Sequence, residues 1–368
     1  MVKGYVLKRS FVCALSVLAI FSIVLLIPSG GYAQEKVITL NYSNFFPAPH
    51  KNSILSDAWC KEVEKRTNGR VKITYFPGGT LTPAPQTYDN VVKGIADIGF
   101  SVFGYSRGKF PMIATMDAPL GYKSGVQATR LVNEFYKKFK PKELDEVQVM
   151  YLHAHGPGIL HTKKPVAKLE DVKGLKIRAQ GTVVPIVQAI GGAPVGASMP
   201  ETYDALRTGV VDGSMAPYEA LEGWKWGEII TSSTECYSIA YTATMFVVMN
   251  KNKWNALPPD IQKIIEQVNA EWTEKQGNTW DEIDKEGKEF SLKRGNKAIA
   301  LSAAEGARWK ATVQPIMEAY ATELKGKGLP GDEALKFCRD YLAKSDQPAA
   351  KEAPAKSKVP PKKQAPKK

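Results

Sequence analysis

The stretch "RVKITYFPGGTLTPAPQTYDNVVKGIADIGFSVFGY", residues 70–105, carries strand and helix signals in turn and decides the fold class. Residues 70–79 are rich in β-branched and aromatic residues and end in a Gly-Gly turn, which predicts a strand. Residues 85–95 predict a helix, and residues 96–105 predict a buried strand. This order favours a largely parallel α/β sheet, in which ligands bind at the carboxyl ends of the strands.

The same alternation continues on both sides of this stretch. A second α/β block begins with the strand signal at residues 146–166. Residues 242–254 predict a strand that returns toward the first block, and a helix-capping serine, Ser302, precedes the last long helix. Further predicted elements are strands at 36–43 and 210–221 and helices at 56–69, 182–192, 200–209, 259–290 and 302–328.

The N-terminus predicts export. The chain starts with basic residues, continues with an apolar run at 11–27 and then has small residues up to Ala33. That order is typical of a secretory signal peptide, so residues 1–33 are predicted to be cleaved and the mature protein to be periplasmic. An uncleaved membrane anchor is the less favoured alternative, because the apolar run lies near the lower limit for spanning a bilayer.

The chain is long enough for two domains, with 368 residues of which 43% are apolar and 24% charged. Its formal net charge of +13 could suggest a nucleic-acid partner. However, much of the positive excess lies in the signal peptide and in the C-terminal tail, so no nucleic-acid partner is predicted. The tail is rich in Pro, Ala and Lys and has little to bury, so we expect it to be disordered.

The cysteines and histidines give no metal signature. Cys60, Cys236 and Cys338 remain after processing, an odd number without a C-x-x-C pair, so we expect mostly buried, inert thiols and at most one disulfide. His153 and His155 alternate on a predicted strand and could face one metal, but no cysteine or carboxylate nearby completes a ligand shell. No metal and no cofactor are therefore predicted, and His155, near a strand end, is expected to face a ligand.

Motifs for catalysis are absent from the sequence. There is no G-x-S-x-G, no P-loop, no G-x-G-x-x-G after a strand and no H-E-x-x-H. No catalytic residue is predicted, and a binding protein is favoured over an enzyme. A secreted hydrolase or lyase using His155 and Tyr218 in the same cleft is the alternative, although these candidates are scattered.

The segment "GLKIRAQG", residues 174–181, places Arg178 at the end of a short apolar run. Burying an unpaired guanidinium is costly, so such a side chain is matched by a carboxylate of the protein or of a ligand. The protein candidates are Asp212 and Glu201. A ligand carboxylate is the other candidate.

Seven segments together resemble a known family. They are "WCKEVEKRTNGRVKITYFPGGTL" (59–81), "GIADIGF" (94–100), "DVKGLKIRAQG" (171–181), "AIGGAPV" (189–195), "ETYDALRTGVVDG" (201–213), "MFVVMNKNKWNALPPDIQ" (245–262) and "GKGLPGDEALKF" (326–337). In this order they resemble the dicarboxylate-receptor-like substrate-binding proteins of tripartite ATP-independent periplasmic (TRAP) transporters.

This resemblance implies a two-domain periplasmic binding protein of the α/β class, with a ligand cleft between the domains and a long C-terminal helix spanning them. The expected boundaries are 34–155 with 245–284 for domain I, 156–244 with 285–340 for domain II, and 341–368 for the tail. The implied function is to bind an organic acid and deliver it to a membrane permease driven by an ion gradient. We expect a monomer, and a receptor that reports ligand to a sensor protein stays open as an alternative.

The resemblance also implies a role for Arg178, because relatives use the arginine of "GLKIR" to pair with the ligand carboxylate. A planar guanidinium offers two parallel donors to such a group. Ser214-Met215-Ala216-Pro217 stands where many relatives have a Gln-Glu-Asn-Pro-like stretch, so the asparagine donor and a metal-coordinating glutamate are missing. Gly156-Pro157-Gly158 lacks the second arginine of some relatives. One arginine therefore predicts one carboxylate.

Aromatic and apolar residues are expected to hold the rest of the ligand. Seven fall at predicted strand ends, and about half are expected to reach it: Phe45, Phe46, Phe103, Tyr105, Met215, Tyr218 and Tyr241. Trp224 could stack on a ligand or pack in a helix interface. The predicted ligand is a monocarboxylate with an apolar or aromatic body. The predicted binding residues are Arg178, Tyr218, Tyr241, Phe103, Phe46, His155, Ser214, Met215, Ala216, Gln180 and Tyr203.

Overall fold

The computed structural model describes residues 37–345 and contains two β-sheets. The predicted signal peptide and the residues after 345 lie outside the described range. The first sheet has the order β2 (Val71–Phe76), β1 (Ile38–Asn44), β3 (Ile98–Val102), β10 (Thr244–Asn250) and β4 (Val147–Ala154). Residues 70–105 therefore form β2 and β3, separated by the short helix α3 (Thr87–Val92), as their pattern predicts.

The first sheet is mixed, which corrects the expectation of a largely parallel sheet. β1 and β3 are parallel, whereas β10 is antiparallel to both β3 and β4. The reason is that β10 returns from the second block and enters between β3 and β4 in the reverse direction. The returning strand was predicted, but its position inside the sheet was not.

The second sheet is also mixed and positions Arg178. Its order is β11 (Lys297–Ala300), β9 (Ser232–Glu235), β5 (Ile159–Thr162), β8 (Gly213–Ala216), β6 (Lys176–Arg178) and β7 (Ala193–Val195). The short strand β6 lies between β7 and β8 and is parallel to both, with Arg178 opposite Val195 and Ser214. Arg178 is thus the last residue of an internal strand, next to the edge strand β7.

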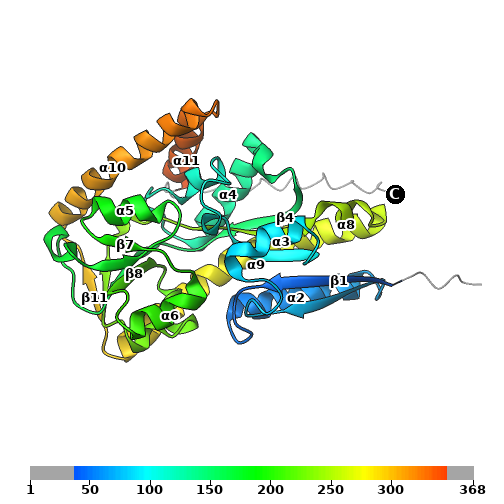
Figure 1. The fold of residues 1–368 in the computed structure, drawn as a ribbon, viewed down its shortest axis with the longest axis horizontal. Coiled ribbons are helices and arrows are strands. Elements are labelled where there is room, and N and C mark those ends of the chain that lie inside the picture. Colours follow the sequence, from blue (N-terminus) through cyan, green and yellow to red (C-terminus); the bar gives the residue numbers. More distant parts are fainter. Residues whose placement is uncertain (1–36, 346–368) are drawn as a thin grey trace, which may run out of the picture. The chain divides into compact units, whose positions relative to one another are not determined.

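Helices surround the sheets (Figure 1). The α-helices are α2 (Lys51–Arg66), α3, α4 (Gly125–Phe139), α5 (Val183–Ala189), α6 (Met199–Arg207), α7 (Glu219–Gly223), α8 (Lys251–Asn255), α9 (Pro259–Lys293), α10 (Ala303–Gly326) and α11 (Gly331–Ser345). Short 3₁₀ helices are η2 (Ala84–Gln86), η3 (Phe103–Tyr105), η4 (Ile113–Asp117), η5 (Lys142–Leu144), η6 (Leu169–Val172), η7 (Trp226–Glu228) and η8 (Tyr237–Ile239). Within residues 37–345, no helix has the length and apolarity needed to cross a bilayer.

The helix α9 contacts both sheet systems. It packs against α2, α4 and β4 around the first sheet, and against α7 and β11 beside the second. Trp272, Gln276 and Trp280 are buried at four-residue spacing along one side of the helix, as expected for an amphipathic helix. The prediction of one long helix that spans both domains is confirmed.

Replacing Gly287 by alanine should destabilise the protein. A Cβ at this position of α9 would lie 2.3 Å from the carbonyl oxygen of Tyr218 at the start of α7, and backbone cannot move aside as a flexible side chain can. Overpacking of this kind costs roughly 1–3 kcal/mol, more than alanine gains over glycine as a helix former. Chemical denaturation measures the change. Gly326→Ala, at a helix end with open space around it, is the matched control, and equal stability of both variants would contradict the packing argument.

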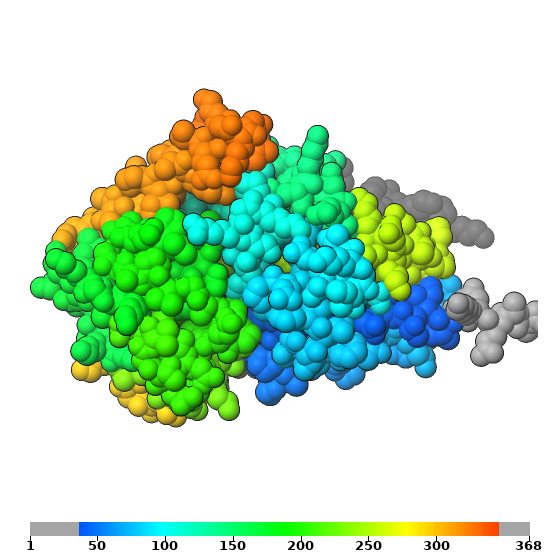
Figure 2. All heavy atoms as spheres, viewed as in Figure 1, coloured from blue at the N-terminus to red at the C-terminus, as the bar shows by residue number. Residues whose placement is uncertain are grey.

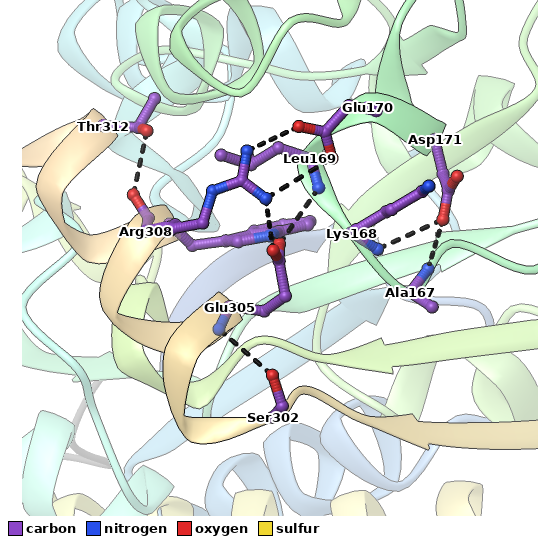
Figure 3. A network of polar contacts seen from close by, with 10 residues as sticks. Ala167, Lys168, Leu169, Glu170, Asp171, Ser302, Glu305, Arg308 and Thr312 are labelled. Atoms are coloured by element: carbon purple, nitrogen blue, oxygen red, sulfur yellow. Dashed lines mark hydrogen bonds and ion pairs between the residues drawn. The ribbon is translucent and has the colours of Figure 1, made fainter.

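A network of polar contacts holds the N-terminus of helix α10 in place (Figure 3). Ser302 caps the helix by accepting from the backbone N–H of Glu305, which confirms its predicted role. Arg308 bonds to both Glu305 and Glu170, and its Nη2 lies 2.5 Å from Oε1 of Glu170. Because Glu170 belongs to η6, the network ties α10 to the segment that leads into β6.

The last helix, α11, differs from the expected boundaries. α11 packs against α4, which covers the first sheet, whereas α10 packs against α5. The helix continues to Ser345, so residues 341–345 are helical and not part of a disordered tail. Leu342 explains this extension, because it is buried in the hydrophobic cluster that also includes Phe135 and Leu131 of α4.

Candidate ligand-binding site

A cavity lies between elements of the two sheets. Its aromatic lining residues are Phe45, Phe46, Tyr105, Trp224, Tyr241 and Trp280. Its polar lining residues are Asp117, His155, Arg178, Gln180 and Glu219. The remaining wall is formed by Val102, Gly104, Val183, Met199, Ala216, Pro217, Ala243 and Met245.

Arg178 is the cation of this cavity. Its side chain is 5% exposed, and its Nε donates to the carbonyl oxygen of Ala197 at 2.7 Å. Among residues 37–345, no carboxylate forms an ion pair with its guanidinium. Both protein candidates are engaged elsewhere, since Asp212 accepts from the backbone N–H of Lys176 and Glu201 accepts from the N–H and hydroxyl of Ser198. Arg178 is still close enough to Glu201 to contribute to the lowered pKa of that carboxyl, behind the larger effect of its bonds to Ser198.

Two tyrosines flank Arg178. The hydroxyl of Tyr105 accepts from the backbone N–H of Met199 at 3.1 Å. Burial raises the pKa of Tyr105, and the nearby cation of Arg178 opposes that rise. The hydroxyl of Tyr241 donates to the carbonyl oxygen of Met215 at 2.9 Å, and burial also raises its pKa. Both phenols thus stay neutral hydrogen-bonding groups beside the guanidinium.

The ring of Tyr241 occupies the place of a side chain at position 158. A Cβ on Gly158 would lie 2.1 Å from a ring carbon of Tyr241. The two residues are also joined by an antiparallel β-bridge. A second arginine at position 158 would have no room unless this ring moved. The absence of an arginine from this segment therefore has a steric reason.

His155 is neutral and its tautomer is fixed. Its Nε2 accepts from the backbone N–H of Ala243 at 3.0 Å, so the proton must be on Nδ1, which lies 2.5 Å from the carbonyl oxygen of Gly156. Burial lowers the pKa of His155 to about 4, and the Arg178 cation adds to the effect. Since both nitrogens are used within the protein, His155 offers its ring to the cavity and no proton for catalysis.

His153 serves the structure. Its Nδ1 accepts from Nε1 of Trp280 at 3.0 Å, and burial lowers its pKa to about 3. The bond holds the Trp280 indole, one of the cavity walls. Within residues 37–345, no group of three or more His, Cys, Asp or Glu side chains is placed to hold a metal ion.

Aromatic rings form a continuous wall away from Arg178. Phe45 lies 6.1 Å from Tyr105 and 6.0 Å from Trp224, measured between ring centroids, and is nearly parallel to Trp224. Phe46 lies 4.2 Å from Phe45 and 5.5 Å from Trp224. These rings are buried and apolar, so they suit a flat apolar body better than a sugar with many hydroxyls.

Glu219 and His50 form a buried pair at the Trp224 end of this wall. Oε1 of Glu219 lies 2.5 Å from Nε2 of His50, and each side chain is 2% exposed. The ring of His50 is 5.8 Å from that of Trp224. His50 caps α2 and Glu219 begins α7, so the pair joins the first sheet system to the second.

Asp117 lies where the cavity adjoins a second, more open one. Both cavities are lined by Asp117 and Gly104. The backbones there are close, since a Cβ on Gly181 would lie 3.1 Å from Cα of Gly104. Figure 2 shows the green surface that includes the segment after β6 against the cyan surface that includes the segment after β3. Oδ1 of Asp117 accepts from the N–H and hydroxyl of Thr244, while burial raises the pKa of Asp117 to about 7.

Six of the eleven predicted binding residues line the cavity, and whether they bind a ligand stays a prediction. They are Arg178, Tyr241, Phe46, His155, Ala216 and Gln180. Of the seven aromatic and apolar residues at strand ends, four line it: Phe45, Phe46, Tyr105 and Tyr241.

The other five predicted residues lie elsewhere. Phe103 packs in the core against Phe110 and Phe246, because it begins the tight turn of η3. Along β8 only Ala216 reaches the cavity wall, and Ser214 and Met215 are fully buried. Tyr218 and Tyr203 are held away from the cavity by glutamates, since their hydroxyls donate to Glu235 and Glu228.

Sequence reasoning missed several cavity residues. Asp117 and Glu219 belong to no strand-end motif, and their burial depends on contacts with Thr244 and His50 far away in the sequence. Trp280 could have been found, because it continues the buried four-residue spacing of α9.

The three cysteines of the described range are free and buried, as the sequence predicts. Burial raises the pKa of Cys236 to about 12 and also raises that of Cys60 and Cys338. Their thiols are therefore protonated and unreactive at neutral pH.

A family of binding proteins matches this fold and site. Residues 48–323 match the bacterial extracellular solute-binding protein family 7. The chain belongs to this family, and its structural neighbours identify it as a solute-binding protein of the TRAP type. Such proteins are receptors without catalytic activity that bind organic acids, so the prediction of a non-enzymatic binding protein is confirmed.

Solved TRAP solute-binding proteins superpose on most of the chain. One from Desulfovibrio salexigens is 32% identical with a TM-score of 0.74, and covers 84% of this chain and 97% of its own. One from Rhodoferax ferrireducens, in complex with copurified benzoate, is 29% identical with a TM-score of 0.79, covering 84% and 98%. One from Bordetella bronchiseptica, with bound mandelate, is 28% identical with a TM-score of 0.77, covering 84% and 100%.

Proposed function

We propose that this protein is a periplasmic receptor for a monocarboxylate with an aromatic or apolar body, which it delivers to an ion-gradient-driven TRAP permease. The observation that carries the proposal is the buried guanidinium of Arg178, which has no carboxylate partner among the described residues and lines a largely aromatic cavity. The ligand carboxylate would take up the unused donors of the guanidinium.

The shape and polarity of the cavity support an aromatic acid. Arg178 is the one cation among the residues that line it, so a second carboxylate would have no charged partner. The ring of Tyr241 leaves no space for another arginine at position 158. The rings of Phe45, Phe46 and Trp224 offer flat apolar surface beyond the acid group. Benzoate and mandelate, bound by two structural neighbours, have this combination of one carboxylate and one ring.

A thermal-shift screen of organic acids tests the proposal. We expect benzoate, mandelate or phenylacetate at 100 times the dissociation constant to add about 2.7 kcal/mol of stability, which raises the melting temperature by roughly 5 °C or more. Succinate and glucuronate should shift it less, and benzamide, which lacks the charge, should not. The proposed ligand class is wrong if the dicarboxylate or the sugar acid stabilises the protein and no aromatic monocarboxylate does.

A further inference from the structure

Glu219 is an acidic residue in the wall of a cavity proposed to bind an acid. Its side chain is 98% shielded from solvent, and it lines the same cavity as Arg178. Oε1 is held by Nε2 of His50. In residues 37–345, no hydrogen bond from the protein to Oε2 is found, and Oε2 is not one of the fully enclosed side-chain atoms that lack a partner. This oxygen is therefore accessible from the cavity that Glu219 lines, and its lone pairs can accept from a donor there.

The structure separates this acceptor from Arg178 by aromatic contacts. Arg178 lies beside Tyr105. The Phe45 ring contacts Tyr105 on one side and Trp224 on the other, and Trp224 contacts His50, which bonds to Glu219. A row of aromatic contacts along the cavity therefore separates the cation from the acceptor. A single molecule lying along this wall can reach both.

We propose that the ligand is bifunctional, with a carboxylate on Arg178 and a hydroxyl or amino hydrogen-bond donor, at the other end of its apolar body, on Oε2 of Glu219. This inference rests on the proposed function and narrows its ligand class. A hydrogen bond to a buried carboxylate is charge-assisted and stronger than one between neutral groups. An acid end cannot take this position, because two carboxylates would repel each other there.

The surroundings of Glu219 hold it in place. A Cβ on Gly223 would lie 2.5 Å from Oε1 of Glu219 and 2.6 Å from Nε2 of His50, so the glycine makes room for the pair. The backbone N–H of Glu219 donates to Oδ1 of Asp284 at 3.0 Å. Glu219 is thus fixed at both backbone and side chain, which leaves its second oxygen preorganised for a ligand donor.

Matched ligand pairs test the proposal by calorimetry on the purified protein. The probes are benzoate and phenylacetate, their 3- and 4-hydroxy and amino derivatives, and the corresponding methoxy compounds, which match the size of a substituent but cannot donate. We expect at least one hydroxy or amino acid to bind about tenfold or more tightly than its parent and its methoxy analogue. In Glu219→Leu the ratio of the affinity for the substituted acid to that for its parent should fall to about one. In Glu219→Gln this ratio should be intermediate. Glu222→Gln, on the exposed side of the same helix, should keep the wild-type ratio.

Three results would overturn the inference while leaving the proposed function intact. One is that parent acids bind as tightly as their hydroxy and amino derivatives in the wild type. Another is that methoxy acids bind as tightly as hydroxy acids. The third is that Glu219→Leu weakens parent and substituted acids equally, which is what a purely structural role for the His50 pair would give. If no aromatic acid binds at all, the proposed function itself fails.

Discussion

Arg178→Met should weaken binding of the tightest aromatic acid by about 100-fold or more. The guanidinium is buried beside Tyr105 and donates Nε to the carbonyl oxygen of Ala197, so the variant would remove the proposed partner of a desolvated ligand carboxylate. Truncating one member of such a buried charge pair costs 2–5 kcal/mol, which corresponds to roughly 30- to several-thousand-fold. Titration calorimetry measures the dissociation constant directly.

Arg178→Lys should lie between the wild type and Arg178→Met. Lysine keeps the positive charge but cannot present two parallel donors to a carboxylate. Arg207→Met is the matched control, because Arg207 pairs with Asp204 on the exposed side of α6. Unchanged acid affinity in Arg178→Met, together with a normal melting profile, would show that the carboxylate binds elsewhere.

Asp117→Asn should stabilise the protein at pH 8 but much less at pH 5. Burial raises the pKa of Asp117 to about 7. Between pH 4 and 7 the folded protein therefore keeps a proton that the unfolded chain has lost, so the free energy of unfolding falls as the pH rises through this window. Ionising the buried carboxyl costs on the order of 4 kcal/mol, of which about 2 to 3 kcal/mol appears between pH 5 and pH 8.

Asparagine is a close replacement at this position. Its side-chain oxygen can still accept from the N–H and hydroxyl of Thr244, as Oδ1 of Asp117 does at 2.8 and 2.7 Å. Denaturant unfolding of both proteins at the two pH values isolates the effect, because contributions of all other groups cancel in the difference. Asp204→Asn, on the surface of α6, is the control and should not change how the free energy of unfolding depends on pH. A gain for Asp117→Asn that is equal at both pH values would mean that the carboxyl does not titrate in this range.

Local sequence signals predict most of the fold because each element carries its own pattern. The strands β2 and β3 have β-branched or aromatic runs bounded by turns, and α9 has a regular apolar spacing. The position of β10 between β3 and β4 has no local signal, since it depends on pairing with strands that lie far away in the sequence. The end of α11 was misjudged for a similar reason, because Leu342 is stabilised by the distant helix α4.

The charged end of the site was the most predictable part. Arg178 stands out because a cation after an apolar strand demands a partner. Phe103 and Tyr105 are both aromatic and two residues apart, yet one enters the core and the other the cavity. The backbone turn of η3 determines which of the two side chains enters the cavity, and this turn cannot be predicted from the residue types alone. Glu219 became a candidate only through its contact with His50, 169 positions earlier in the chain.

The burial of Cys60, Cys236 and Cys338 makes the folded body well suited to use as an optical sensor. Thiol-reactive dyes attack thiolates, and burial keeps these three protonated and out of reach. A cysteine introduced on the exposed face of α6 or at the rim near Gly181 could then be labelled selectively within residues 37–345, without first removing the native thiols. We expect a dye at such a position to change its emission when an organic acid binds, which would give a readout of ligand concentration.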